Sequence, residues 1–182
     1  MLFSQMKFCS SCGAAVEYTI VEGDTHKRFV CTSCKTIHYT NPKVVVGALV
    51  HWEDKVLLCR RAIEPRYGYW NLPAGYLEDG EQSQEGAARE VVEEAGAEIN
   101  IEGVHAVYNL PQANQVYIHF IAELKEGKYS NGPESIETAL FREDEIPWKE
   151  MAFTSSYFAL KRYFEDRKAG RRVTHLGTYP EI

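Results

Sequence analysis

One stretch of 23 residues, GYLEDGEQSQEGAAREVVEEAGA (75–97), restricts the fold more than any other part of the chain. Small and aliphatic residues recur in it at three- and four-residue steps and predict an amphipathic helix over residues 83–95. These residues are Ala87, Ala88, Val91, Val92 and Ala95. Gly96 follows where a helix favours a terminating glycine. A helix with one apolar stripe must pack that stripe against another layer of structure.

The segments around this helix have the composition of strands. VVVGALVHW (44–52) and VLLCRRA (56–62) are apolar and β-branched and are joined by the turn EDK, and Cys59 reads as a core residue of the second strand. VYIHFIAEL (116–124) alternates, and IETALFRE (136–143) predicts a further strand. A second helix is expected from Thr154 or Ser155 to Gly170, and the glycine- and proline-rich segment 64–81 is expected to be a loop. Strands mixed with two helices predict a layered α/β domain.

The charge on the first helix is unusual. The stretch holds seven carboxylates and a single cation, Arg89; the carboxylates are Glu78, Asp79, Glu81, Glu85, Glu90, Glu93 and Glu94. Helical spacing places Glu90, Glu93 and Glu94 together, and like charges at this spacing destabilise a helix. Arg89 can pair with Glu85 and Glu93 at four-residue steps, but the remaining charge needs a partner. Hard divalent cations prefer oxygen ligands, so the helix predicts a metal platform for a phosphate-containing substrate.

The spacing of these residues resembles that of a known family. Gly75, five residues, Glu81, seven residues, Arg89-Glu90-Val91, one residue, Glu93-Glu94, one residue and Gly96-Ala97 match the Nudix box at all nine fixed positions. The resemblance implies a Nudix hydrolase, an α/β/α sandwich with a mixed sheet. It also implies two or three Mg²⁺ or Mn²⁺ ions and cleavage of a nucleoside diphosphate linked to another group, X.

The same resemblance implies roles for the box residues. Glu90 and Glu94 are expected to be the main metal ligands, Glu93 an additional ligand in the catalytic machinery, and Glu81 a support of the site. The carbonyl of Gly75, or that of Ala74, is expected to complete a metal shell, and Arg89 to orient the glutamates. In this family the general base lies in the helix or in a later loop, where Glu134 is favoured over Glu137.

The substrate is less constrained than the chemistry. NADH pyrophosphatases carry a Ser-Gln-Pro-Trp-Pro-Phe-Pro run after the box, which is missing from EINIEGVHAVYNLPQANQ (98–115). The chain resembles instead zinc-ribbon Nudix enzymes related to plant FAD and ADP-ribose pyrophosphatases, which implies FAD or ADP-ribose as substrate. An NADH pyrophosphatase, a non-catalytic nucleotide sensor and a zinc-ribbon adaptor are the alternatives.

Candidate substrate contacts follow from the chemistry of a nucleotide. Arginine suits a diphosphate, and an aromatic ring suits a base. Arg60, Arg66 and Tyr76 are the predicted contacts, with Arg61, Tyr39 and Tyr108 as further candidates.

Four cysteines predict a second metal site. They form the pairs Cys9-Ser-Ser-Cys12 and Cys31-Thr-Ser-Cys34, eighteen residues apart, a spacing typical of one structural zinc ion. Disulfides and unrelated buried thiols are the alternatives, and a reducing compartment disfavours disulfides. Residues 1–40 are therefore expected to form a zinc ribbon and residues 41–182 the Nudix domain, joined at TNPK (40–43). His26 and His38 are expected to be solvated or packing residues.

Overall charge and hydropathy restrict the partners. A net charge of −6 argues against non-specific nucleic-acid binding, which needs a basic face. The family resemblance implies a small nucleotide as the partner. No apolar run approaches the ~18 residues that span a membrane, and no signal peptide is visible at the N-terminus, so a cytoplasmic protein is expected. The family resemblance and the aromatic segment YNLPQANQVYIHF imply a homodimer.

Overall fold

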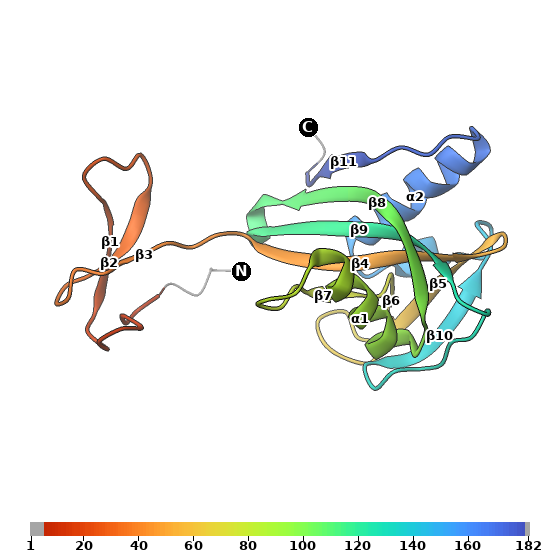
Figure 1. Ribbon diagram of the computed structural model, residues 1–182, viewed down its shortest axis with the longest axis horizontal. Helices are drawn as coiled ribbons and strands as arrows, with labels where there is room; N and C mark the ends of the chain where they lie inside the picture. Colours follow the sequence, from red (N-terminus) through yellow and green to blue (C-terminus); the bar gives the residue numbers. More distant parts are fainter. Residues whose placement is uncertain (1–5, 181–182) are drawn as a thin grey trace. The chain divides into compact units, whose positions relative to one another are not determined.

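The computed structural model describes residues 6–180 and contains two compact units, with the boundary between Pro42 and Lys43. The first unit is a three-stranded antiparallel sheet in the order β1-β2-β3 (Figure 1). Its strands are β1 (Val16–Ile20), β2 (Lys27–Cys31) and β3 (Ile37–His38). Among its described residues only Cys9 and Cys31 are fully buried, so this unit has almost no apolar core.

The second unit is built on one mixed sheet in the order β10-β5-β4-β9-β8-β11. The strands are β4 (Lys43–Trp52), β5 (Lys55–Arg61), β8 (Ile99–Leu110), β9 (Gln115–Leu124), β10 (Ser135–Phe141) and β11 (His175–Thr178). The β4–β9 and β8–β11 pairs are parallel, and the other pairs in this order are antiparallel. Two short strands, β6 (Trp70–Asn71) and β7 (Ala74–Tyr76), pair with β5 and β4.

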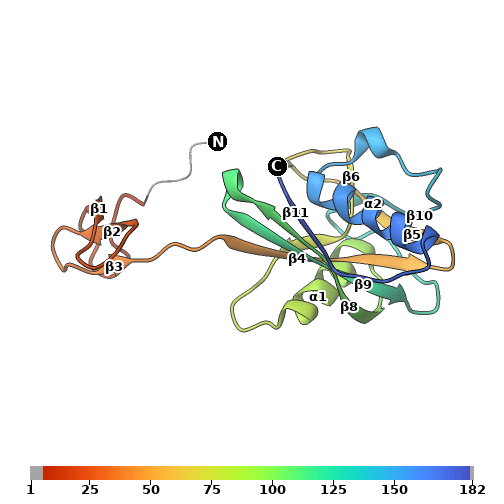
Figure 2. The same ribbon diagram turned by 90° about the horizontal axis from the view of Figure 1, so that it is seen from above.

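One helix packs on each face of this sheet, as Figure 2 shows from above. α1 (Ser83–Ala95) covers a cluster that includes Ala48, Val50 and Leu57, and α2 (Thr154–Lys168) covers one that includes Leu49 and Leu58. Successive residues of β4 and β5 thus point to opposite helices, as a strand buried on both faces requires. Two short 3₁₀ helices, η1 (Pro111–Ala113) and η2 (Trp148–Glu150), complete the fold. The predicted α/β/α sandwich with a mixed sheet is confirmed.

The first helix has the predicted bounds. Gln82 and Glu85 form a capping box at its start, and Gly96 ends it in the left-handed conformation (φ 52°) with its N–H donating to Val92. The predicted apolar stripe is partly wrong, because Val92 is 53% exposed. The buried face is rotated and includes the carboxylates of Glu90 and Glu94.

The structure corrects the predicted loop over 64–81, which contains β6 and β7. It also adds β8 and β11, for which no strand is predicted from the sequence. The pairing register of β8 with β9 shifts between Ile101 and Gly103 and again between Val104 and Ala106. Each shift inserts an extra residue and breaks the two-residue alternation, so the longest strand lacks the pattern by which strands are recognised.

Candidate metal and catalytic sites

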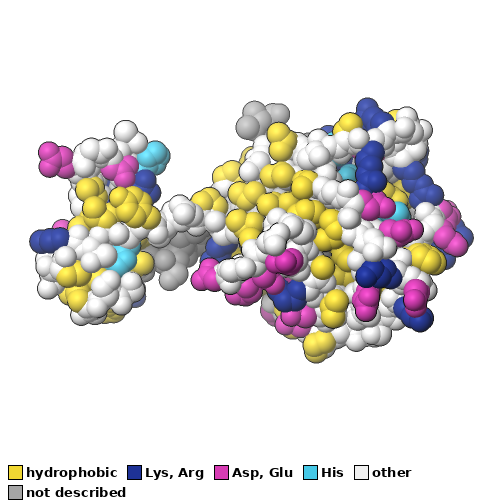
Figure 3. All heavy atoms as spheres, in the orientation of Figure 1, with side chains coloured by type: hydrophobic (Ala, Val, Ile, Leu, Met, Phe, Trp, Pro, Cys, Tyr) yellow, Lys and Arg dark blue, Asp and Glu magenta, His cyan; other side chains and the backbone are white. Residues whose placement is uncertain are grey.

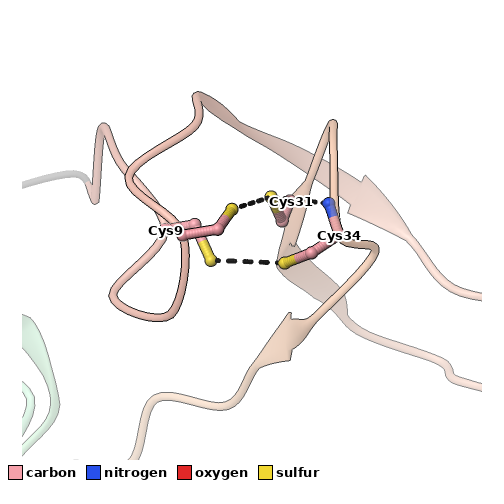
Figure 4. Close-up of side chains that lie close together, drawn as sticks. Cys9, Cys31 and Cys34 are labelled. Carbon is pink, nitrogen blue, oxygen red and sulfur yellow. Dashed lines mark hydrogen bonds between the residues drawn. The ribbon is translucent and has the colours of Figure 1, made fainter.

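The four paired cysteines of the first unit converge on one point (Figure 4). Their sulfur atoms all lie within 4.8 Å of one another, with Cys9–Cys34 at 3.7 Å and Cys12–Cys31 at 3.4 Å. Sulfurs about 2.3 Å from one ion are roughly 3.8 Å apart in a tetrahedron, whereas a disulfide joins them at about 2.0 Å. All four are free thiols, so the arrangement fits one zinc ion and not the disulfide alternative.

Hydrogen-bond donors already surround these sulfurs. Backbone N–H groups of Ser11 and Cys34 donate to Cys9 and Cys31 at 3.4 and 3.3 Å. The Thr36 hydroxyl lies 3.1 Å from the Cys34 sulfur and lowers the pKa of that thiol to about 6. Such donors stabilise the thiolates that zinc requires.

His38 takes part in this outer shell, which the sequence does not predict. Its Nε2 atom lies 3.3 Å from the Cys9 sulfur and donates to it when Cys9 is a thiolate. His26, by contrast, is solvated as expected, with 78% of its side chain exposed. β3 brings His38 to the cysteines from 29 residues away in the chain, and sequence spacing carries no signal of that contact.

Two glutamates of α1 are buried beside β7, the strand that contains Gly75. Glu90 and Glu94 are each 8% exposed, whereas the side chain of Glu93 is 56% exposed. Helical spacing predicts the three glutamates together, but the structure buries Glu90 and Glu94 and leaves Glu93 exposed. A Cβ atom at Gly75 would lie 2.3–2.5 Å from the Glu90 carboxylate, so any side chain here would displace that carboxylate. Gly75 thus forms a cradle in which its backbone approaches the carboxylate directly.

Arg89 holds the carboxylates in place. It donates to both oxygens of Glu81 at 2.6 and 3.0 Å, to Glu90 at 2.7 Å, to Glu93 at 3.0 Å and to the carbonyl of Tyr76 at 3.1 Å. These contacts fit the roles predicted for Arg89 and Glu81. The predicted pair with Glu85 is not formed, because the Glu85 carboxylate caps the helix by accepting from the Gln82 N–H at 3.0 Å.

One arginine leaves the site with excess negative charge. Burial raises the pKa of Glu94 to about 8, with a further contribution from Glu90, and burial also raises the pKa of Glu90. Figure 3 shows acidic side chains gathered over the region of β7 and α1. Within residues 6–180, the four cysteines are the one group of three or more ligand side chains that already lie close enough together to hold a metal ion. A set of carboxylate and carbonyl oxygens beside a glycine cradle fits Mg²⁺ or Mn²⁺.

The loop before β10 adds another carboxylate to this region. Gly132 donates to the carbonyl of Glu94 at 3.0 Å, and the carbonyl of Glu134 accepts from Ala62 at 2.8 Å. A Cβ atom at Gly132 would lie 1.8 Å from the Glu93 carbonyl oxygen, so only glycine allows this approach. The charge of Glu134 contributes to the raised pKa values of Glu90 and Glu94. Glu137, the other candidate base, lies 3.8 Å from Arg60.

The predicted substrate contacts lie in different surroundings. Tyr76 directly follows Gly75, is 47% exposed, and accepts at its hydroxyl from Gln115 at 2.9 Å. Arg60 donates to the Gly68 carbonyl, and Arg66 lies over the ring of Tyr69. Neither arginine is within 4 Å of a box glutamate among the described residues. Tyr108 is buried in the core, and Tyr39 lies in the first unit beside Arg28.

Comparison with curated proteins finds relatives with two kinds of name. A NAD-capped RNA hydrolase NudC of Stutzerimonas stutzeri (strain A1501) is 33% identical over 147 residues, which cover 79% of this chain and 51% of that protein. An ADP-ribose pyrophosphatase of Methanocaldococcus jannaschii is 29% identical over 113 residues, covering 60% of this chain and 67% of that protein. The chain thus spans about half the length of the NudC relative.

A solved structure resembles the chain over nearly its whole length. The crystal structure of a NUDIX hydrolase from Nitrosomonas europaea is 51% identical, with a TM-score of 0.91 over 95% of this chain and 98% of that one. Two family profiles also match, one described as Nudix N-terminal over residues 7–40 and one as NUDIX domain over residues 41–161. The chain therefore belongs to the Nudix hydrolase family and carries the zinc-ribbon segment found at the N-terminus of some of its members.

Proposed function

We propose that the protein hydrolyses the pyrophosphate bond of a nucleoside diphosphate linked to a second group and releases two monophosphates. The observation that carries this proposal is the set of carboxylates that Arg89 holds beneath the Gly75 cradle, with Glu90 and Glu94 buried. A protein that only sensed nucleotides or bound a partner would not need two costly buried carboxylates beside a further acidic loop.

The side chains have separate tasks in this reaction. Glu90, Glu94 and the carbonyl of Gly75 would hold the ions, with Glu93 as an additional ligand. Bound Mg²⁺ or Mn²⁺ would offset the phosphate charge and acidify a water molecule. Arg89 keeps the carboxylates oriented, since it contacts three of them at once. Glu134 would accept the proton of the attacking water, with Glu93 as the alternative base.

FAD and ADP-ribose are the favoured substrates. The missing Ser-Gln-Pro-Trp-Pro-Phe-Pro run and a relative named ADP-ribose pyrophosphatase support this choice. A second candidate is a NAD-type substrate, free or at the end of an RNA, because another relative is named NAD-capped RNA hydrolase. Tyr76, exposed beside Gly75, is the proposed contact for an aromatic ring of the substrate.

A substrate panel tests the function. FAD, ADP-ribose, NADH and NAD-capped RNA should be incubated with the purified protein and Mg²⁺ or Mn²⁺, in ¹⁸O-labelled water. Attack at phosphorus predicts two monophosphates with the label on one product phosphate. FAD or ADP-ribose is expected to give the highest kcat/KM. Absence of cleavage across the panel, or label on a ribose carbon–oxygen bond, would contradict the proposal.

We also propose a cytoplasmic homodimer. The four thiols of the cysteine cluster support this location, because a reducing compartment keeps thiols free of disulfides. No helix within residues 6–180 is long and apolar enough to cross a membrane. Light scattering at micromolar concentration checks the assembly, because a monomer would have a mass of 20.8 kDa.

A further inference from the structure

Arg61, the last residue of β5, lies on the same side of the sheet as the box glutamates. Leu57 and Cys59 belong to the cluster beneath α1, whereas Leu58 belongs to the cluster beneath α2. The Cys59 sulfur lies 3.7 Å from the Glu94 carbonyl. Because residues two apart share a face of a strand, Arg61 leaves the sheet on the α1 side, the side on which Glu94 lies.

Local contacts fix the backbone and stem of Arg61. Its N–H donates to the Tyr69 carbonyl at 2.9 Å, and its own carbonyl accepts from Gly68 at 2.8 Å. In the side chain, Nε donates to the Pro65 carbonyl at 2.9 Å, and the guanidinium carbon lies 5.1 Å from the centroid of the Phe153 ring. The guanidinium is therefore held in one place before any ligand binds.

The two Nη groups of Arg61 have no partner in the described part of the chain. No carboxylate lies within 4 Å of its guanidinium, and only Nε makes a hydrogen bond. Four N–H donors thus remain available in a fixed plane, a geometry that matches phosphate oxygens. The positive charge of Arg61 nevertheless acts on the site. Burial raises the pKa of Glu94, and the charge of Arg61 lowers it.

The other arginines near the site are engaged. Arg89 makes five hydrogen bonds to carboxylates and to the Tyr76 carbonyl. Arg60 points to the opposite face of β5, donates to Gly68 and lies near Glu137. Arg66 is exposed and lies over the ring of Tyr69. Of these four residues, Arg61 alone combines proximity to Glu94 with unpartnered donors.

We propose that Arg61 binds the pyrophosphate of the substrate through its free Nη groups, an assignment that rests on the proposed function. In the hydrolysis, one water forms a new phosphorus–oxygen bond and loses a proton to Glu134. The bridging phosphorus–oxygen bond breaks, and its electron pair remains on the departing phosphate. Arg61 offsets the negative charge that develops there, so it contributes more to turnover than to ground-state binding.

Paired substitutions test this role in the full-length protein. Arg61→Ala should lower kcat/KM for ADP-ribose or FAD by about 100-fold, mostly in kcat, and Arg61→Lys should restore part of it because the charge returns without the planar donors. Arg60→Ala should lower kcat/KM by no more than about tenfold. Added guanidinium should partly rescue Arg61→Ala and not Arg60→Ala. Equal losses for both alanine variants, or a larger loss for Arg60→Ala, would overturn the assignment.

A binding measurement separates this role from a structural one and from the enzymatic proposal. The probe is α,β-methylene ADP in the presence of Mn²⁺. A methylene group replaces the bridging oxygen of its diphosphate, so water cannot cleave it. Arg61→Ala should bind it about threefold more weakly, while its Mn²⁺ affinity and melting temperature stay at or above those of the wild type. Wild-type binding without hydrolysis of any panel substrate would sink the enzymatic proposal but not this one. Equal affinity in the two proteins, or no binding by either, would sink the role of Arg61.

Discussion

The zinc ribbon and the Nudix domain both present metal ligands, but they place them differently relative to their cores. In the ribbon the two fully buried described side chains, Cys9 and Cys31, are themselves ligands. In the Nudix domain two large apolar clusters and a small one form without any ligand, and the glutamates lie at the edge of that structure. A metal ion is therefore expected to hold the ribbon together, whereas in the Nudix domain metal ions are expected to serve the proposed reaction.

The two sites also differ in how their charge is balanced before metal binds. The cysteine sulfurs accept from backbone N–H groups, from Thr36 and from His38. Arg89 pairs with Glu81, Glu90 and Glu93, whereas Glu94 has no ion pair in the described part of the chain, and the pKa values of both Glu90 and Glu94 are raised. The first arrangement suits a permanently held zinc ion, and the second leaves excess negative charge that divalent cations can neutralise.

Removal of zinc should have the largest effect and should separate the behaviour of the two units most clearly. A strong chelator, or Cys9→Ser, should unfold the ribbon, because metal binding supplies about 10 kcal/mol in small zinc modules. The Nudix domain should remain folded. All three tryptophans, Trp52, Trp70 and Trp148, lie in it, so tryptophan fluorescence reports on that unit alone. Circular dichroism and cobalt substitution report on the ribbon. A fluorescence transition on chelation would show that the two units depend on one metal.

Glu94→Gln should have the opposite effect, loss of activity without loss of fold. Turnover should fall by about 10³-fold at saturating Mg²⁺, because a ligand charge is lost at nearly constant volume. In metal-free protein the melting temperature should stay equal or rise, since a buried carboxyl with a raised pKa is replaced by a neutral amide. Glu98→Gln is the control, because the Glu98 side chain is 77% exposed. Near-normal turnover of Glu94→Gln would refute the ligand assignment.

The Nudix domain has a buried histidine in its core, and this residue should make the stability of the domain depend on pH. His119 on β9 is 1% exposed, neither ring nitrogen has a partner among the described residues, and burial lowers its pKa to about 3 from 6.5. Below pH 6.5 this histidine binds a proton in the unfolded chain but stays neutral in the folded chain. Stability is therefore lost as pH falls from 6.5 towards 3, by about 2 kcal/mol between pH 7 and pH 5.

His119→Leu should remove this acid-dependent loss. Urea titrations followed by tryptophan fluorescence at pH 7 and pH 5 give the difference in unfolding free energy for each protein. The variant should lose about 2 kcal/mol less than the wild type over this range. Parallel changes in the two proteins would show that His119 takes up its proton without unfolding.

The smallest expected effect concerns the outer shell of the zinc site. His38→Phe keeps a ring but removes the donor to Cys9, and should speed zinc release to a chromogenic chelator by about tenfold. His26→Phe is the matched control, because His26 belongs to the same ribbon and is not hydrogen-bonded to a cysteine. Equal zinc release rates for the two variants would show that His38 packs against the site without stabilising the bound zinc.

Features that depend on neighbours along the chain could be predicted from the sequence. Cysteine spacing indicated the zinc ligands, and helical periodicity located α1 with its terminating Gly96. The spacing from Gly75 to Ala97 identified the family. Short-range geometry decides these features, so they do not depend on how distant segments pack.

Tertiary structure decided which of the candidates act together. Sequence spacing favoured Glu85 as a partner of Arg89, but the loop after β7 brings Glu81 there instead. Packing against the sheet buried Glu90 and Glu94 and left Glu93 exposed, and the Gly132 loop brought Glu134 towards them. The pleat of β5 separates Arg60 from Arg61, two residues of identical chemistry that face opposite helices. Contacts between segments far apart in the chain determine burial, charge and direction, and no local pattern contains them.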